Sequence, residues 1–89
     1  MTVKVSMHAG ERMSYHRHGY REEVWTVVSG NGKAIVDGME QILRVGDVLP
    51  IAAGYKHTII ADTNLDIIEV QLGETLSEED KKKYPSEEL

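Results

Sequence analysis

Three of the four histidines in this sequence, together with one glutamate, have the types and spacing of metal ligands. His16 and His18 lie two residues apart, so both imidazoles project from the same face if this segment is a β-strand. Glu23 begins the next extended run, and we expect a hairpin to return it alongside His18. His57 begins a later run after a glycine-bearing turn. We therefore predict that His16, His18, Glu23 and His57 converge on one divalent metal ion.

Ligands of this kind suit several metals. Neutral imidazoles with one carboxylate match zinc, manganese, iron, nickel or cobalt, and the absence of cysteine excludes a thiolate site. Such a set leaves one or two coordination positions open, where a water or a substrate oxygen binds and Lewis-acid catalysis becomes available. A His-x-His pair alone is weak evidence, because alternating histidines also occur on ordinary polar strand faces.

The elements that position these residues are expected to be short antiparallel strands. Apolar residues, many of them β-branched, recur with strand spacing in short runs separated by glycine-bearing turns. The strands predicted in this way span 3–7, 13–18, 23–29, 33–37, 39–43, 48–51, 57–61 and 65–72. Strands at this density without intervening helices indicate an all-β sandwich or barrel, formed as a single domain over residues 1–89.

Two turns are predicted to close β-hairpins. Ser29-Gly30-Asn31-Gly32 and Asp37-Gly38 contain glycine next to asparagine or aspartate, and these residue types tolerate positive φ. Both sequences are typical of the tight turn between two paired strands.

The sequence changes character after Gly73, where a short C-terminal helix is expected. Ser77 is a capping residue with an acid three positions later, and Lys81–Lys83 follow where the helix dipole favours positive charge. Pro85 ends the predicted helix, and the lysine run is interpreted as its solvated end.

The composition restricts the classes of partner that the protein is expected to bind. The chain of 89 residues carries a net charge of -5, which argues against nucleic acid or an anionic membrane as the partner. It has no apolar stretch near the roughly 20 residues that a membrane span requires. A domain of this size buries a limited core, so we expect a homodimer, located in the cytoplasm.

Glycines at fixed distances from the proposed ligands extend the pattern. Gly10 precedes His16, Gly30 follows Glu23, and the glycines at 46 and 54 precede His57. In this order the residues resemble the two signature motifs of the cupin superfamily. The resemblance implies a small jelly-roll barrel, or double-stranded β-helix, and a metal site at the motif histidines and glutamate.

Residues outward from the ligands narrow the resemblance. Gly10–Ser14, Arg21–Trp25, Val27–Gly30 and Ile68–Glu74 are similar to the phosphomannose isomerase domain of type II enzymes, commonly the C-terminal half of a bifunctional isomerase and mannose-1-phosphate guanylyltransferase. The similarity implies a metal-dependent interconversion of mannose 6-phosphate and fructose 6-phosphate. Guanylyltransferase activity is not expected, because no glycine-rich nucleotide-binding segment is present.

Two basic residues are candidate catalytic residues under this resemblance. Arg21 matches the arginine of the family's His-Arg-x-Glu segment, and a guanidinium binds phosphate bidentately. Lys56, one residue before His57, is a second candidate for phosphate contact or proton transfer. A surface ion pair for Arg21 and a solvated side chain for Lys56 are the alternatives. Trp25 is interpreted as a packing residue of the core or of an interface.

The sequence leaves two other functions open. The family usually has glutamine at the position of His16, and Gly19-Tyr20 replaces its histidine-rich stretch, which makes the site more like a general cupin centre of three histidines and one glutamate. Another mononuclear-metal cupin, an oxygenase or isomerase of a small oxygenated substrate, is therefore one alternative. A non-catalytic cupin that binds a sugar or another small ligand is the other.

Overall fold

The structure is a computed structural model that describes residues 1–18, 21–73 and 81–83, with the backbone alone described at 17, 18 and 81–83. Every regular element in these ranges is a strand. The strands are β1 (Thr2–Met7), β2 (His16–His18), β3 (Glu22–Ser29), β4 (Gly32–Val36), β5 (Met39–Leu43), β6 (Val48–Ile51), β7 (His57–Ala61), β8 (Leu65–Leu72) and β9 (Lys81–Lys83). No helix capable of crossing a membrane occurs within these ranges.

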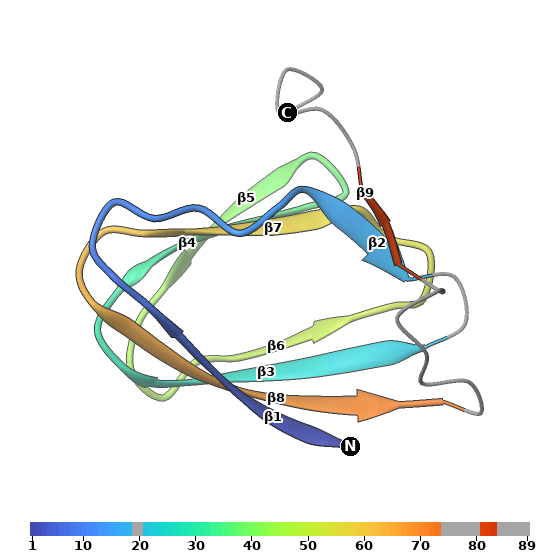
Figure 1. The fold of residues 1–89 in the computed structure, drawn as a ribbon, viewed down its shortest axis with the longest axis horizontal. Helices are drawn as coiled ribbons and strands as arrows, with labels where there is room; N and C mark the ends of the chain where they lie inside the picture. Colours follow the sequence, from blue (N-terminus) through green and yellow to red (C-terminus); the bar gives the residue numbers. More distant parts are fainter. Residues whose placement is uncertain (19–20, 74–80, 84–89) are drawn as a thin grey trace.

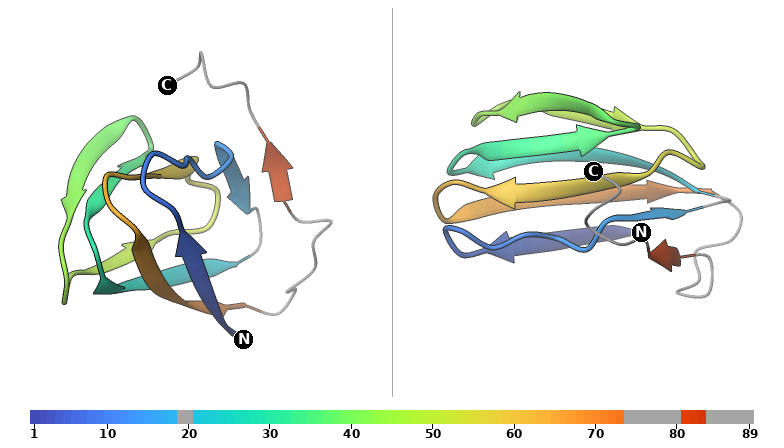
Figure 2. Two further views of the ribbon diagram at one scale, coloured as in Figure 1. Left: turned by 60° about the vertical axis from the view of Figure 1, so that its left-hand side comes forward. Right: turned by 90° about the horizontal axis from the view of Figure 1, so that it is seen from above.

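The strands form two antiparallel sheets that face each other (Figure 1). The four-stranded sheet has the order β1-β8-β3-β6, and the five-stranded sheet has the order β5-β4-β7-β2-β9. Two further views show the sheets enclosing a common interior, with consecutive strands often crossing from one sheet to the other (Figure 2). The prediction of an all-β jelly-roll barrel is confirmed.

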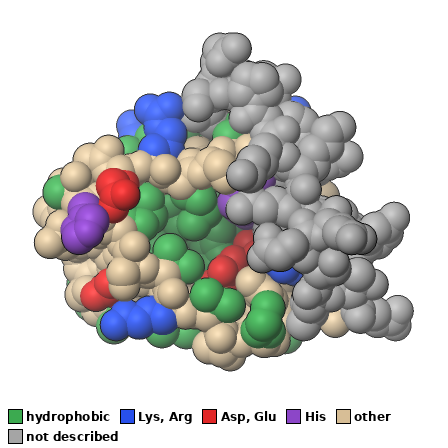
Figure 3. Space-filling model, in the orientation of Figure 1, with side chains coloured by type: hydrophobic (Ala, Val, Ile, Leu, Met, Phe, Trp, Pro, Cys, Tyr) green, Lys and Arg blue, Asp and Glu red, His purple; other side chains and the backbone are tan. Residues whose placement is uncertain are grey.

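The interior is filled largely by alternate residues of the long strands β3 and β8. In β3 and β8 every second side chain is buried, as expected for strands with one face toward a core. Hydrophobic side chains gather in the space between the two sheets, as seen in Figure 3. The buried hydrophobic cluster consists of Trp25, Val27, Ala34, Leu43, Leu49, Ile51, Ile59, Ala61, Leu65 and Ile67.

One of the two hairpin predictions is confirmed and the other is wrong. Asp37 and Gly38 have φ of 50° and 82° and join the paired strands β4 and β5. Ser29–Gly32 instead carries the chain from β3 in one sheet to β4 in the other. Gly30 has φ of 80°, and a Cβ there would lie 1.9 Å from the backbone oxygen of Asn64. Positive φ thus predicts a tight turn, but it does not say which strands the turn joins.

The pairing expected for β2 is also wrong, and β2 is shorter than predicted. Glu23 does not return beside His18 in a hairpin, because β3 belongs to the four-stranded sheet and β2 to the five-stranded sheet. Within the predicted strand 13–18 only His16–His18 is regular. β2 pairs with β7 instead, and Glu23 faces it across the interior.

The prediction of a C-terminal helix is wrong at Lys81–Lys83, which are the predicted helical residues that the structure describes. Ser77 and Pro85 lie outside the described residues. Lys81–Lys83, however, form β9, which pairs antiparallel with β2. An edge strand such as β2 presents unpaired backbone groups, and a lysine-rich segment can satisfy them as a strand despite its helical propensity.

Candidate metal centre

The interior contains a cluster of buried polar side chains, and both sheets contribute residues to it. His16 and His57 are register partners in β2 and β7, and their rings meet edge to face with centroids 4.3 Å apart. Glu23 comes from the opposite sheet and places Oε1 3.3 Å from His57 Nε2. His57 and Glu23 are each 1% exposed and His16 is 4% exposed. Three of the four predicted ligands therefore converge in the interior.

Backbone hydrogen bonds orient both imidazoles. Nδ1 of His16 is 2.6 Å from the carbonyl oxygen of Ser14, and Nδ1 of His57 is 3.0 Å from that of Tyr55. A carbonyl oxygen can only accept, so each Nδ1 carries the proton and donates it. The tautomer fixed in this way makes Nε2 the nitrogen with the lone pair, which is the arrangement that metal-binding histidines commonly show.

His18, the fourth predicted ligand, lies at the end of β2. Its backbone is in register with Lys81 of β9. Its side chain lies outside the described residues, so its role as a ligand stays a prediction.

Arg21 lies beside Glu23. Its Nη2 is 3.1 Å from Glu23 Oε2, and the side chain is 7% exposed. The Glu23 carboxylate therefore has the Arg21 guanidinium beside Oε2, whereas Oε1 faces the lone pair of His57 Nε2. The guanidinium compensates the buried carboxylate, because desolvation opposes its negative charge. The lone pairs on Oε1 and Nε2 are directed at a common point, where a cation would be favourable. The ion pair of Arg21 with Glu23 is buried rather than at the surface, and the proposed contact of Arg21 with substrate phosphate stays a prediction.

The other residues singled out in the sequence lie around this polar cluster. Trp25 is almost fully buried and packs edge to face on His57, with ring centroids 5.2 Å apart, so its packing role is confirmed. Lys56 is half-buried immediately before β7, and its catalytic role stays a prediction. Glu22 is exposed while Glu23 is buried, as alternation along the strand requires.

Two polar residues of β8 complete the polar cluster and were not predicted from the sequence. Glu69 and Gln71 are buried, and they are the register partners of Trp25 and Glu23 on β3. The Trp25 indole Nε1–H donates to Glu69 Oε1 at 3.3 Å. Burial and the neighbouring Glu23 carboxyl raise the pKa of Glu69 to about 7. The signal was available, since both residues fall on the inward positions of a strand whose other inward residues, Leu65 and Ile67, are apolar.

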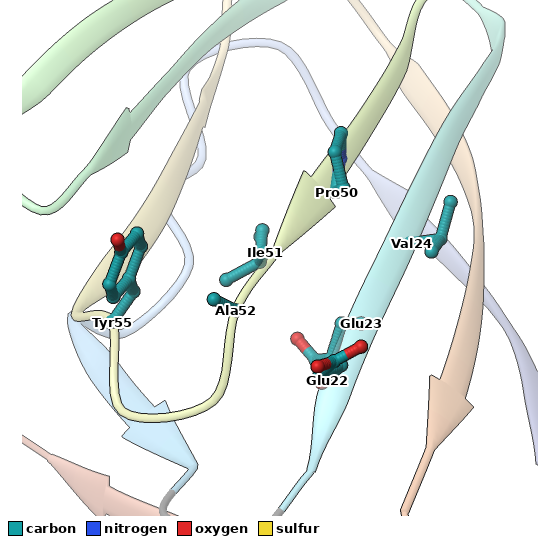
Figure 4. Close-up of a pocket in the computed structure, with 7 residues that line it drawn as sticks. All are labelled: Glu22, Glu23, Val24, Pro50, Ile51, Ala52 and Tyr55. Atoms are coloured by element: carbon teal, nitrogen blue, oxygen red, sulfur yellow. The ribbon is translucent and has the colours of Figure 1, made fainter.

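A pocket of about 270 Å³ opens beside the site (Figure 4). It is formed by the first residues of β3, the end of β6 and the loop that leads to His57. Glu23 lies in its wall, so the candidate ligand borders the pocket. The lining residues are Glu22, Glu23, Val24, Pro50, Ile51, Ala52 and Tyr55.

The donor set fits a divalent metal, although the ligands are not preassembled as a cage. Within the described ranges, no three histidine, aspartate or glutamate side chains are already arranged around one cation position. Two Nε2 atoms and one carboxylate are nevertheless the ligand types that first-row divalent metals select. Glu23 could serve as a ligand after its carboxylate moves from Arg21 and His57 toward a shared metal position.

The fold and the site together define a small antiparallel barrel with a histidine and carboxylate centre. Residues 3–71 match the cupin domain family, and the chain belongs to this family.

Several relatives match this chain over only a small part of their own length. The chain is 31% identical over 83 residues to a mannose-1-phosphate guanylyltransferase of Escherichia coli K12, covering 91% of the chain and 17% of that protein. It is 33% identical over 78 residues to the alginate biosynthesis protein AlgA of Pseudomonas aeruginosa, covering 85% of the chain and 16% of that protein. The chain thus spans about a sixth of these relatives, and the matches confirm the resemblance to their cupin part.

Among solved structures, an uncharacterized conserved protein with a double-stranded β-helix domain from Klebsiella pneumoniae is similar with a TM-score of 0.83. The two share 19% sequence identity, and the match covers 96% of this chain and 74% of that one. This similarity supports the fold alone.

Proposed function

We propose that this chain binds one divalent metal ion through His16, His18, Glu23 and His57 and interconverts an aldose phosphate and a ketose phosphate. The substrate pair proposed is mannose 6-phosphate and fructose 6-phosphate. The observation that carries the proposal is the convergence of Glu23 with His57 and His16, deep between the two sheets. The sequence similarity to proteins named for mannose 1-phosphate supports the choice of sugar.

Each group has a defined part in this reaction. A bound divalent metal would supply Lewis acidity toward the oxygens on C1 and C2 of the sugar. The Nδ1 hydrogen bonds of His16 and His57 hold their rings so that Nε2 is presented as a ligand. Trp25 packs edge to face against His57, which is buried in the interior. Arg21 and Lys56 supply positive charge for the substrate phosphate.

The test is metal analysis of the purified protein combined with a coupled assay of mannose 6-phosphate conversion, with and without a chelator. Glu23→Gln removes a ligand, and Glu40→Gln is the matched control, because Glu40 is exposed on β5 in an ion pair with Lys33. We expect about one metal per chain in the wild type and in Glu40→Gln, and loss of metal and of turnover in Glu23→Gln. Isomerisation that persists in the chelated protein would contradict the mechanism.

Arg21→Ala separates two roles of this arginine. Loss of turnover with the metal retained would support the proposed phosphate contact. Loss of the metal as well would mean that Arg21 acts by holding Glu23, because its Nη2 is 3.1 Å from Glu23 Oε2. Arg21→Lys keeps the charge but not the bidentate geometry, so we expect it to restore only part of the activity.

The outcome of the same assay distinguishes the two alternatives. A redox-active metal with no sugar-phosphate turnover would favour another mononuclear-metal cupin. Tight sugar-phosphate binding without turnover would favour a non-catalytic binding cupin.

We also propose that two copies of this chain associate through the outer face of the four-stranded sheet. This face carries outward apolar side chains on three neighbouring strands, namely Val24, Val28, Val48, Ile68, Val70 and Leu72. Light scattering tests this, with Val48→Lys expected to give monomers. Ile42→Lys is the control, because Ile42 is equally exposed but lies on β5 of the other sheet. A monomeric wild type would contradict the proposal.

A further inference from the structure

The inward side of β8 changes from apolar to polar along the strand. Leu65 and Ile67 belong to the hydrophobic cluster, whereas Glu69 and Gln71 carry polar groups into the same interior. Neither polar residue belongs to the predicted ligand set. Both lie in the sequence segment 68–74, to which the proposed reaction assigns no role.

Gln71 is held firmly in place. On one side it is the register partner of Glu23. On the other side its backbone N–H donates to the Met1 carbonyl at 2.7 Å, and its own carbonyl accepts from the Met1 amino group at 3.0 Å. The side chain is 6% exposed. The backbone of Gln71 is thus fixed on both sides, and its side chain is buried on the wall of the barrel beside the candidate metal ligand.

The two ends of the Gln71 amide differ in their contacts. The side chain is hydrogen-bonded to Glu69, and the amide NH₂ is the end that can donate to a carboxylate. Within the described part of the chain, the other end, Oε1, is buried and has no hydrogen-bond donor. Buried acceptors in folded proteins almost always have a donor, so Oε1 is a position where a donor from a bound ligand or a buried water fits.

We propose that Gln71 Oε1 accepts a hydrogen bond from a hydroxyl group of the bound ligand and thereby selects polyhydroxylated substrates. The inference rests on the proposed function for the location of that ligand, because Gln71 lies across from Glu23 on the β3 and β8 wall. A neutral amide oxygen recognises a neutral donor, and a hydroxyl group of a sugar phosphate is such a donor. A ligand without that hydroxyl leaves the buried oxygen unsatisfied and binds more weakly.

The experiment measures binding rather than turnover. Isothermal titration of the metal-loaded protein uses mannose 6-phosphate and its monodeoxy analogues as probes. The variants are Gln71→Met and Gln71→Leu, which replace the amide with apolar groups of similar size. Gln41→Met is the matched control, because Gln41 lies exposed on β5. Circular dichroism establishes that each variant is folded.

We expect the wild type and Gln41→Met to bind one of the deoxy analogues at least about tenfold more weakly than the parent sugar phosphate. The Gln71 variants should bind the parent about tenfold more weakly and should no longer distinguish that analogue from it. If both Gln71 variants bind mannose 6-phosphate as tightly as the wild type, Oε1 contacts a buried water only, and the inference is wrong.

Failure of the inference and failure of the proposed function give different results. Hydroxyl discrimination that depends on Gln71 in a protein without turnover would support the inference and contradict the isomerase. Normal turnover in both Gln71 variants would support the isomerase and contradict the inference. A metal-loaded wild type that binds no sugar phosphate would contradict both.

Discussion

The interior of this barrel has an apolar half and a polar half, and the same strands build both. β3 carries Glu23 at one end and Val27 toward the other, and β7 begins with His57 and continues to Ile59. β8 carries Gln71 at the polar end and Leu65 at the apolar end. The two halves therefore share one backbone framework. They differ only in their inward side chains, which are apolar in one half and polar in the other.

The comparison shows how a small barrel can hold several buried charges. Hydrophobic burial in the apolar half stabilises the fold, whereas desolvated carboxyl groups in the polar half oppose it. Functional centres commonly reduce stability in this way, and the rest of the fold must compensate. Removing apolar side-chain volume from the apolar half should therefore destabilise the fold, whereas neutralising a buried carboxyl group in the polar half should stabilise it.

The largest expected effect is at Gly30, where the chain passes from β3 to β4. An alanine there adds a Cβ 1.9 Å from the Asn64 backbone oxygen, at a φ of 80°. We expect Gly30→Ala to destabilise the protein by several kcal/mol, roughly 3 or more, as measured by urea unfolding. Gly38→Ala is the control, because Gly38 has a similar φ of 82° but a Cβ there meets nothing within 4 Å. Equal losses in the two variants would show that close packing against Asn64 does not matter.

The next effect is cavity formation at Ile67 in the apolar half. Ile67 is almost fully buried, so Ile67→Ala should lower the free energy of unfolding by about 2 to 5 kcal/mol. Its neighbour Ile68 points to the outer face, and Ile68→Ala should cost less, about 1 kcal/mol. Urea unfolding of both variants measures the difference. A larger loss of stability for Ile68→Ala would contradict the assignment of the core to the face of β8 that carries Ile67.

A smaller effect of opposite sign is expected at Glu69 in the polar half. Burial and the Glu23 carboxyl raise the pKa of Glu69 from 4.5 to about 7. Its contribution to stability is therefore fully present below pH 4.5 and is lost as the pH rises through about 7. In the chelated protein, Glu69→Gln should be about 1 to 2 kcal/mol more stable than the wild type at pH 8, and the gain should vanish near pH 4. Unfolding curves at the two pH values measure this, and a gain independent of pH would contradict the explanation.

The smallest effect is expected at Asp66, on the outward side of β8. Hydrogen bonds from Ser6 and Ser29 and the charge of Lys4 hold the pKa of Asp66 below its usual 3.8. The stability that it contributes is present above pH 3.8 and is lost as the pH falls through the lowered pKa. Asp66→Asn should thus lower the urea midpoint slightly at pH 7 and leave it unchanged near pH 2. A difference that grows on acidification would contradict this assignment.

The sequence predicted the strands well because their signals are local. A short run rich in β-branched residues and bounded by turn residues identified β8, and Asp37-Gly38 identified a hairpin. The hairpin predicted at Ser29–Gly32 was wrong, because the same turn residues occur in a hairpin and in a connection between sheets. The helix predicted at Lys81–Lys83 was wrong because pairing with the open edge of β2 is a tertiary interaction, which helix propensity does not report.

The candidate site was predictable to the extent that its residues belong to motifs. His16, Glu23 and His57 were identified by spacing, and the structure brings them together. Glu69 and Gln71 were missed because their role depends on facing β3, which only the strand order establishes. The contact of Arg21 with Glu23 was missed although it is local, since a spacing of two residues places both side chains on one face of an extended segment.

The most direct test of the metal centre is the metal stoichiometry of histidine variants, measured by elemental analysis after dialysis against trace metal. The account predicts about one metal ion per chain in the wild type and in His8→Ala, whose histidine is exposed before the first turn. It predicts almost none in His57→Ala and in His18→Ala. Full metal occupancy in His57→Ala, or none in the wild type, would contradict the claim that these side chains share one cation.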